Sequence, residues 1–350
     1  ISGQLQTGAP SIRVAAAWLG GPAPHPSSAE SLALAGSLAA NAGQIAMTGL
    51  TATIGGNSLR GDLALSMLQP RLLLRGALSL DVLDLDADGG ASPAGGMPAP
   101  VAPPAPPASP HATQTPRSSQ PQVRGWSSRL IELGALRLAD ADLGLDVGRI
   151  VFRSVRSGRS RITATVRGGA LKAVVQETSL YQGRGKGTLD IDASASVPVM
   201  RLSASLEGFD TQALLAATAG FDRIAGRGML TLDVAGRGPT QQQMTQSLTG
   251  TATLGISNGA LLGFDMPAMI RQAQRGQVPQ ATGNPSERTE FSELSGSFAI
   301  AAGVAQSQDL KLVSSVLRVG GAGSFDLGRQ QMDLRLKPKL VAGAASAGIP

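Results

Sequence analysis

The sequence contains no cysteine, only two histidines and few aromatic residues, and each scarcity removes a class of function. Without cysteine, disulfides, zinc–thiolate sites and thiol catalysis are excluded. The two histidines, His25 and His111, both lie in proline-rich sequence, where no rigid element would position a general base or a metal ligand. Aromatic residues make up 3% of the chain, which is too few to build stacking platforms for nucleic acid.

Long apolar runs are also missing. No stretch reaches the roughly 18 residues that a transmembrane helix requires. The chain begins at Ile1, in the middle of an apparent strand pattern. We therefore interpret it as a piece of a longer protein, whose signal or membrane anchor lies outside this sequence.

Motifs that would carry chemistry are incomplete. The run Asp84-x-Asp86-x-Asp88 opens like a calcium-binding loop, but the twelfth position, which needs a glutamate, is Gly95. The glycine-rich stretch 183–187 precedes a strand pattern instead of a helix, so it indicates a hairpin turn and not a phosphate site. The sequence predicts a protein that is not an enzyme and that uses no metal or cofactor.

Glycine is abundant, with 45 residues, and it opens short segments of alternating apolar and polar residues. Because side chains alternate between the two faces of a strand, each segment has one apolar and one polar face, which is typical of antiparallel sheets. The spacing of the segments is too irregular for a solenoid of fixed period. We predict a mainly β fold, a long meander of repeated antiparallel hairpins. The motif Gly-x-apolar-x-apolar begins at Gly61, Gly76, Gly187, Gly228, Gly296 and Gly323.

Capping signals predict a few short helices inside this β pattern. Asp210 precedes the first, Thr240 and Gln243 form a capping-box pattern at the second, and Asp265 precedes the third. We expect these helices at 211–219, 241–248 and 266–275.

Composition divides the chain. One segment is dominated by Ala, Pro, Gly and Ser, and it cannot bury enough apolar area to offset its ordering entropy. The β pattern resumes after it, with strand candidates at 127–133 and 135–138. We divide the chain into an N-terminal β segment at 1–86, a disordered linker or insertion at 87–125, a second β region at 126–340 and a flexible tail at 341–350.

The net charge of +6 comes mainly from arginine, with the densest cluster at 149–172. A basic surface favours anionic partners such as lipid headgroups. A solvated sheet face that keeps the protein soluble explains the same pattern, and both interpretations stay open.

Several tracts in the C-terminal third resemble one protein family. They include residues 226–240, 257–265 and 289–304, and the succession ends at 309–327. In this order they resemble the C-terminal region of AsmA-family proteins, over about 226–336, whereas residues 1–86 are similar in style only.

This resemblance implies a bacterial protein that an N-terminal helix anchors in the inner membrane, with its body in the periplasm. Relatives form long, curved antiparallel sheets with an apolar inner groove, support outer-membrane biogenesis and are thought to conduct phospholipids between the membranes. The implied partners are phospholipids, the inner and outer membranes and, as further candidates, other envelope proteins. The family offers no catalytic residues to carry over. The segment 87–125 is expected to interrupt a continuous groove.

On this basis we expect acyl chains to lie along an apolar stripe while headgroups stay at its solvent edge. The candidate lipid-contacting residues are Leu230, Leu232, Val234, Leu254, Phe298, Ile300, Leu310, Leu312, Phe325 and Leu327. The candidate headgroup-contacting residues are Arg153, Arg156, Arg201 and Arg318.

The apolar stripe also fits a second hypothesis. Two apolar faces that bury each other would form a closed β-sandwich, acting as a scaffold or adaptor for outer-membrane protein assembly without a lipid conduit. Periodicity alone does not decide between a groove and a sandwich.

Overall fold

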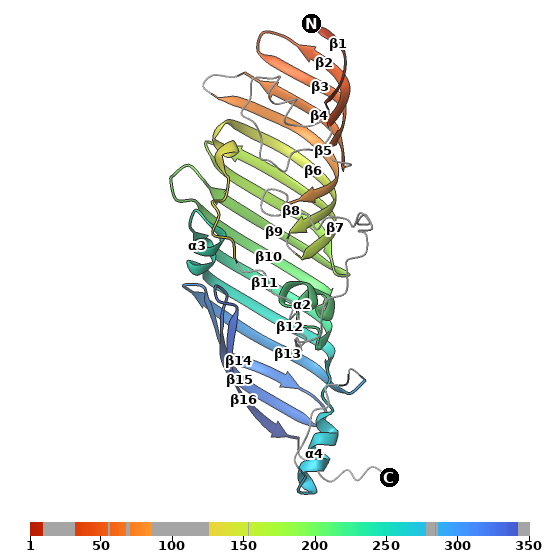
Figure 1. The fold of residues 1–350 in the computed structure, drawn as a ribbon, viewed down its shortest axis with the longest axis vertical. Coiled ribbons are helices and arrows are strands. Elements are labelled where there is room, and N and C mark those ends of the chain that lie inside the picture. Colours follow the sequence, from red (N-terminus) through yellow and green to blue (C-terminus); the bar gives the residue numbers. More distant parts are fainter. Residues whose placement is uncertain are drawn as a thin grey trace, which may run out of the picture.

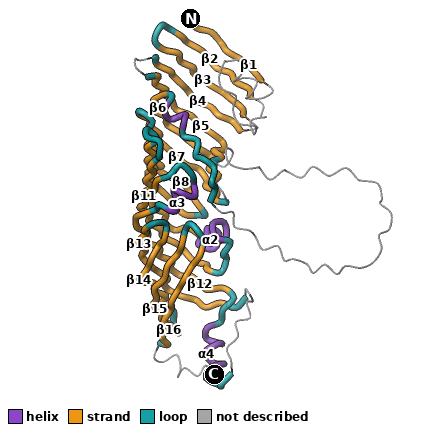
Figure 2. The backbone as a smooth tube through the Cα atoms, turned by 60° about the vertical axis from the view of Figure 1, so that its left-hand side comes forward, coloured by secondary structure: helices purple, strands orange, loops and turns teal. Residues whose placement is uncertain are grey.

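The described part of the chain forms one long, curved β-sheet (Figures 1 and 2). The sheet has sixteen strands, and together with three short α-helices they confirm the predicted mainly β fold. The computed structural model describes residues 1–9, 32–54, 57–67, 71–85, 126–152, 154–277, 284 and 286–341. Residues 10–31, the segment 87–125 and residues 342–350 of the predicted tail lie outside these residues.

The strands coincide with the segments of alternating polarity. Strands β1–β5 are Ser2–Ala9, Leu32–Ala40, Gln44–Ile54, Asn57–Ser66 and Leu72–Asp84. Strands β6–β16 are Ala139–Phe152, Val155–Arg167, Ala170–Leu180, Gly183–Asp192, Val199–Asp210, Ile224–Arg237, Thr249–Leu262, Arg288–Ala301, Val304–Val313, Leu317–Asp326 and Gln331–Leu340.

The order of the strands in the sheet is the order of the chain, from β1 to β16. Each strand is antiparallel to the next, except that β5 and β6 are parallel. The sequence predicted antiparallel pairing throughout. A parallel pair needs a connection long enough to return to the end where the first strand began, and residues 85–138 supply that length.

The expectation that the segment 87–125 interrupts the groove is wrong for the sheet itself. Strands β5 and β6 stay in register from the pair Leu72 and Ala139 to the pair Asp84 and Val151. The chain leaves the sheet after β5 and re-enters it as β6, directly beside β5, so the sheet continues without a gap.

Ion pairs join the strands on both sides of this parallel joint. Arg71 pairs with Asp140 at 3.1 Å, and Asp142 pairs with Arg75 at 3.4 Å and with Arg167 at 2.6 Å. The hydrogen bond from Arg167, with a further contribution from Arg75, lowers the pKa of Asp142. Because the pairs are partly exposed, each contributes modestly to stability, and their main effect is to fix the register of β5 against β6.

The helices follow the predicted caps. They are α2 (Thr211–Ala219), α3 (Gln241–Gln246) and α4 (Met266–Gln274). Asp210, Thr240 and Asp265 each accept a hydrogen bond from the backbone N–H three residues later, at 3.0, 3.1 and 2.8 Å. Figure 1 places α2 and α4 along one long rim of the sheet and α3 along the other. None of the helices in the described residues has the length and hydropathy of a membrane-spanning segment.

The strand candidates at 127–133 and 135–138 are wrong. Residues 126–138, which we call the rim strap, form an extended segment and a 3₁₀ turn, η1 (Gly134–Arg137), on the rim that carries α3 (Figure 1). The indole Nε1 of Trp126 donates to Leu327 O at 2.7 Å, at the turn between β15 and β16. Ile131 N donates to Pro239 O at 2.8 Å. The strap bonds to strand ends instead of pairing as a strand, so the alternation signal there was misleading.

Arginine fixes the other end of the rim strap. The Arg137 guanidinium donates to Ala193 O at 2.6 Å and to Ala195 O at 2.8 Å, between β9 and β10. The strap therefore runs back along the strand ends from β15 to the start of β6, and it ties together turns that are far apart in the sheet.

Candidate functional site

One row of residues follows the strand register across the whole sheet. It takes one residue from each strand, and every member is glycine or apolar. We call the face that carries this row the apolar face. The row is Gly3, Leu38, Met47, Leu63, Gly76, Leu143, Ala164, Ala173, Leu189, Leu202, Val234, Gly250, Ile300, Ala305, Phe325 and Met332.

The adjacent row, on the opposite face, has a different character. Among the described residues it is mixed and mostly polar, with Thr188, Ser203, Asp233 and Thr251 in successive strands from β9 to β12. Because neighbouring positions along a strand point to opposite faces, the sheet has one apolar and one polar surface along its length. The alternation seen in the sequence predicts this division.

The structure brings the ten candidate lipid-contacting residues together on the apolar face. Six of them pack in one cluster at the α3 rim: Leu232, Val234, Phe298, Ile300, Phe325 and Leu327. Leu254 and Leu312 pack in a second cluster nearer the opposite rim. Leu230 pairs with Leu254 across β11 and β12, and Leu310 lies against Gly296.

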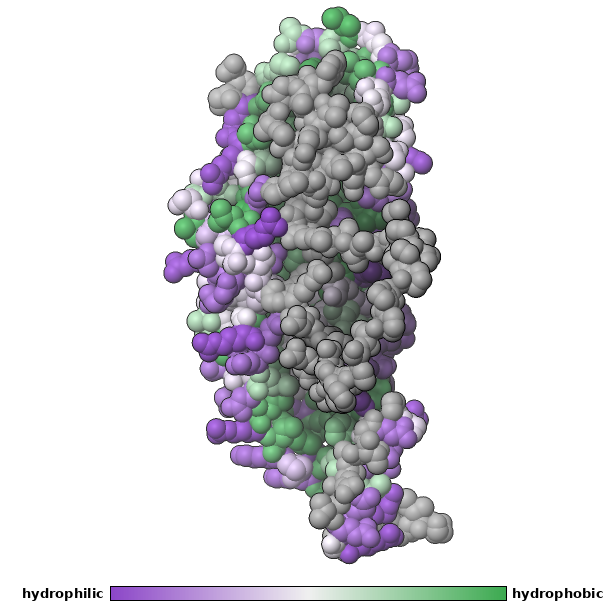
Figure 3. All heavy atoms as spheres, viewed as in Figure 1, coloured by the Kyte–Doolittle hydropathy of each residue, from purple (hydrophilic) through white to green (hydrophobic). Residues whose placement is uncertain are grey.

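The ten residues differ in exposure. Val234, Ile300 and Leu312 are buried, so they hold the sheet together and present little surface. The other seven are half-buried. The rings of Phe298 and Phe325 pack edge to face with their centroids 5.6 Å apart, a favourable arrangement for aromatic pairs. In Figure 3, apolar residues gather between hydrophilic margins over the C-terminal strands. The surface that a ligand could contact is therefore aliphatic and partly open.

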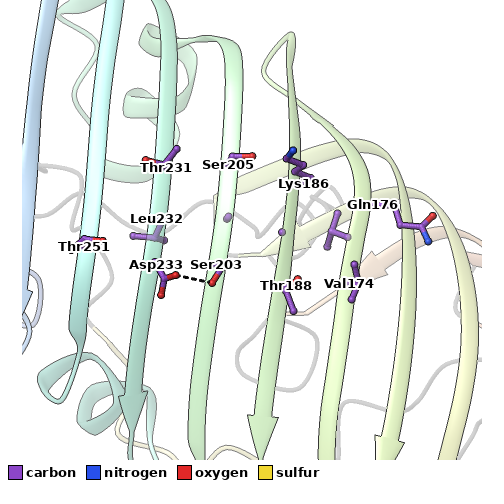
Figure 4. Close-up of a pocket in the computed structure, with 13 residues that line it drawn as sticks. Val174, Gln176, Lys186, Thr188, Ser203, Ser205, Thr231, Leu232, Asp233 and Thr251 are labelled. Atoms are coloured by element: carbon purple, nitrogen blue, oxygen red, sulfur yellow. Dashed lines mark hydrogen bonds between the residues drawn. The ribbon is translucent and has the colours of Figure 1, made fainter.

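The polar face carries a shallow hollow of about 520 Å³ over β8–β12 (Figure 4). Hydroxyl groups of Thr188, Ser205 and Thr231 line it. The hydroxyl of Ser203 donates to Asp233 at 3.2 Å. This hollow lies behind the apolar face and does not belong to it.

Two of the predicted arginines, Arg201 and Arg318, do not lie on the apolar face. The register pairs Arg201 with Asp190 and Arg318 with Lys339, both on the polar face. Arg156 is exposed near the start of β7, where the register pairs it with Val151, and Arg153 lies outside the described residues. Sequence periodicity does hold the signal for this, because Arg201 and Arg318 alternate with Leu202 and Val319.

The carboxylates with shifted pKa values are structural. In the described residues, each shift resolved is downward and comes from hydrogen bonds on the surface. Bonds from Lys311 Nζ and Ser295 Oγ, both at 2.8 Å, lower the pKa of Glu293. The hydroxyl and N–H of Ser297 lower the pKa of Asp309. These carboxylates stay ionised at neutral pH and fasten neighbouring strands.

Comparison with known sequences gives the decisive observation on relationship. The sequence model of the AsmA family matches residues 26–310, which is most of the chain. The chain belongs to the AsmA family. Comparison with curated proteins and with solved structures gave no match.

The match to the AsmA family begins further upstream than the sequence tracts indicated, because it includes most of the N-terminal strands, and it ends within β14. This agrees with the continuous row of apolar residues, which is as regular in β2–β5 as in β11–β15. The sequence-based candidates do not include the upstream residues of the row, such as Leu63, Leu143 and Leu189. Their alternation with polar neighbours was the signal that could have found them.

Proposed function

We propose that this AsmA-family chain carries the acyl chains of phospholipids along its apolar face. We place it in the periplasm, attached to the inner membrane through an N-terminal anchor outside this sequence, where it supports outer-membrane biogenesis. The observation that carries the proposal is the uninterrupted row of glycine and apolar residues through all sixteen strands. Family membership supports a role in the bacterial envelope.

The size of the face suits this function. Adjacent strands lie about 4.8 Å apart, so sixteen strands extend roughly 70 Å along the sheet. One leaflet of a bilayer has a hydrocarbon thickness of about 15 Å. The face is thus several acyl chains long, and a lipid could move along it without leaving an apolar surface.

Weak and repeated contacts suit transport better than one tight pocket. Each buried methylene contributes roughly 0.8 kcal/mol to transfer from water, and shallow contacts recover only part of this. Neighbouring strands offer residues of similar kind, mostly Leu, Ala and Gly, so one position along the row is nearly equivalent to the next. A lipid would be held but not trapped.

The proposed activity needs no catalysis and no cofactor. Every resolved pKa shift of a described carboxylate is downward. A carboxyl that donates a proton at neutral pH needs the opposite, a raised pKa. Asp142, Glu293 and Asp309 are engaged in hydrogen bonds that fasten strands, and Asp192 accepts hydrogen bonds from Ser194 in the turn after β9.

The competing hypothesis was a closed sandwich that acts as a scaffold or adaptor. The described strands belong to one sheet, so the two packed sheets of a sandwich are not its architecture. A scaffold built on an open sheet remains as an outcome of the experiment below.

Native mass spectrometry of the purified chain, followed by solvent extraction and lipid analysis, tests the proposal. The key variant is Leu230→Asp, in which a half-buried apolar-face residue gains a charge that a bound acyl chain would desolvate. The matched control is Thr231→Asp, which places the same charge one residue away on the opposite, exposed face.

We expect the wild type and Thr231→Asp to bind phospholipid. The amount bound to Leu230→Asp should be lower by roughly tenfold or more. Circular dichroism checks that each variant is folded, and the milder Leu230→Thr replaces Leu230→Asp if the latter is not. A folded wild type that carries no lipid, or equal lipid on both variants, would overturn the proposal and favour the scaffold.

A further inference from the structure

Strand β16, the last in the described sheet, exposes its apolar side, whereas the apolar side of the other strands is partly covered. Its apolar-face residues include Met332, Leu334, Leu336 and Leu340, which are 65%, 38%, 56% and 52% exposed. They continue the apolar face, because the register pairs Met332 with Phe325 and the others with β15 positions on that face. Among the described residues no strand pairs with the outer edge of β16. The apolar face therefore extends to β16, the edge of the described sheet.

The opposite side of the same strand is basic. Arg335, Lys337 and Lys339 alternate with the apolar residues and are exposed. The register places Arg318 directly beside Lys339. Asp333 is the one acidic residue of the strand. Like charges side by side are unfavourable in a sheet, so this cluster needs a reason other than stability.

Helix α4 lies at the same end of the molecule (Figures 1 and 2). Its N-terminus is tied to the sheet by a hydrogen bond from Met266 N to Thr289 Oγ1 at 2.9 Å, and its main packing partner is β13. Beside it, Phe264 is 41% exposed, and Arg271 and Arg275 are exposed. A second element at this end thus combines apolar and basic groups on the surface.

The N-terminal end of the sheet is different. Strands β1, β2 and β3 contain no Asp, Glu, Lys or Arg. The two ends of one apolar face therefore have different electrostatic surroundings, and the basic end carries the four exposed apolar side chains of β16.

We propose that the end formed by β16 and α4 docks on the surface of an anionic lipid bilayer. Cations near an anionic leaflet gain from its negative surface potential, and the exposed apolar residues gain by entering the boundary between headgroups and acyl chains. Backbone N–H and C=O groups on the outer edge of β16, which pair with no described strand, favour headgroup level, because they cannot be satisfied in hydrocarbon.

A bilayer fits this edge better than an added strand from a protein. Pro338 has no N–H to donate, and lysines on an edge strand oppose further pairing. Docking goes beyond the proposed function: it assigns a surface and a partner, and it holds whether or not the apolar face carries lipid.

Flotation of the whole chain with lipid vesicles tests the docking. One set of vesicles is phosphatidylcholine and the other an equimolar mixture of phosphatidylcholine and phosphatidylglycerol. We expect binding to the mixed vesicles only. The triple variant Arg335→Gln, Lys337→Gln, Lys339→Gln should bind them roughly a hundredfold more weakly. The control Lys172→Gln, Arg184→Gln, Lys186→Gln removes the same charge from exposed positions on β8 and β9 and should bind as the wild type does.

The apolar contribution has its own pair of variants. Leu336→Ser should lower binding by about tenfold, whereas Met229→Ser, which removes an equally exposed side chain (56%) from the polar face of β11, should not. If a β16 variant and its matched control lose vesicle binding equally, the contact is not at β16. A wild-type dimer in size-exclusion chromatography that Leu336→Ser dissociates would mean that a second copy covers the strand. Either result overturns the docking.

The two proposals fail separately. Leu230→Asp removes lipid carriage but leaves β16 intact, so it should still float with mixed vesicles. Loss of flotation in the β16 triple variant, with bound lipid unchanged, separates docking from carriage in the other direction.

Discussion

Phe209 provides the sharpest test of how the rim beneath α2 is built. It is 1% exposed. Gly208 precedes it in the left-handed conformation, with φ of 69°, and the resulting bulge in β10 turns the ring onto the apolar face. There the ring lies over Gly228, where an added methyl group would overlap it, and beside Gly183. One side chain thus packs against β9 and β11 at once.

The magnitude follows from this burial. Replacing a fully buried phenylalanine with alanine costs about 3–5 kcal/mol. Each strand contacts mainly its two neighbours, so stability is approximately a sum of local terms, and the loss should fall on α2 and β9–β11. A local loss of 3 kcal/mol raises the rate of amide hydrogen exchange by roughly a hundredfold, because each 1.4 kcal/mol is a factor of ten.

Hydrogen exchange with mass spectrometry measures this directly. We expect Phe209→Ala to accelerate exchange in peptides of α2 and β9–β11 and to leave β1–β5 unchanged. Phe221→Ala is the control: the same truncation, just beyond α2, at a residue that is 44% exposed, with an expected effect within about 0.5 kcal/mol. Equal acceleration in the two variants, or less than about tenfold in Phe209→Ala, would refute this description of the rim.

Two further predictions concern the fastening of the sheet. Asp309 accepts hydrogen bonds from Ser297 and Ser307 that lower its pKa, so its contribution is present above the ordinary aspartate pKa of about 3.9 and is lost as pH falls through the lower folded-state value. Thermal unfolding should therefore show Asp309→Asn below the wild type at neutral pH and equal to it in strong acid; a constant difference would contradict this. Trp126→Phe removes the indole hydrogen bond to Leu327 and should cost about 0.5–1.5 kcal/mol, seen as faster exchange at the β15–β16 turn; unchanged exchange there would mean that the rim strap is not held by this bond.

Much of the architecture was predictable because it is local. Asp210 and Gly220 fix both ends of α2 from sequence alone, and alternation gives most of the strands and both faces. The glycines of the repeated motif have a physical explanation that the sequence does not show. Gly76 and Gly323 leave room on the apolar face for Leu63 and Leu334 of the neighbouring strands.

The features that escaped prediction depend on contacts between distant segments. Whether β6 lies parallel or antiparallel to β5 is decided by where the chain re-enters after a long connection, which no local pattern encodes. The rim strap has an alternating pattern at 127–133 like a strand, but its N–H groups bond to turns such as Pro239. The exposure of β16 likewise depends on its place at the edge of the described sheet and not on its pattern.

The agreement between strand order and chain order has a consequence for how the molecule forms. Each new strand finds its partner in the strand made just before it, so the sheet can assemble as a zipper while the chain emerges, with contacts that are mostly close in sequence. The rim strap is the exception, since the bond from Trp126 to Leu327 joins residues 201 positions apart. This end of the strap must wait until β15 exists. The strap therefore docks fully only at a late stage. A chain shortened before β15 could still pair its strands in sequence, but it would lack the bond that holds this end of the strap.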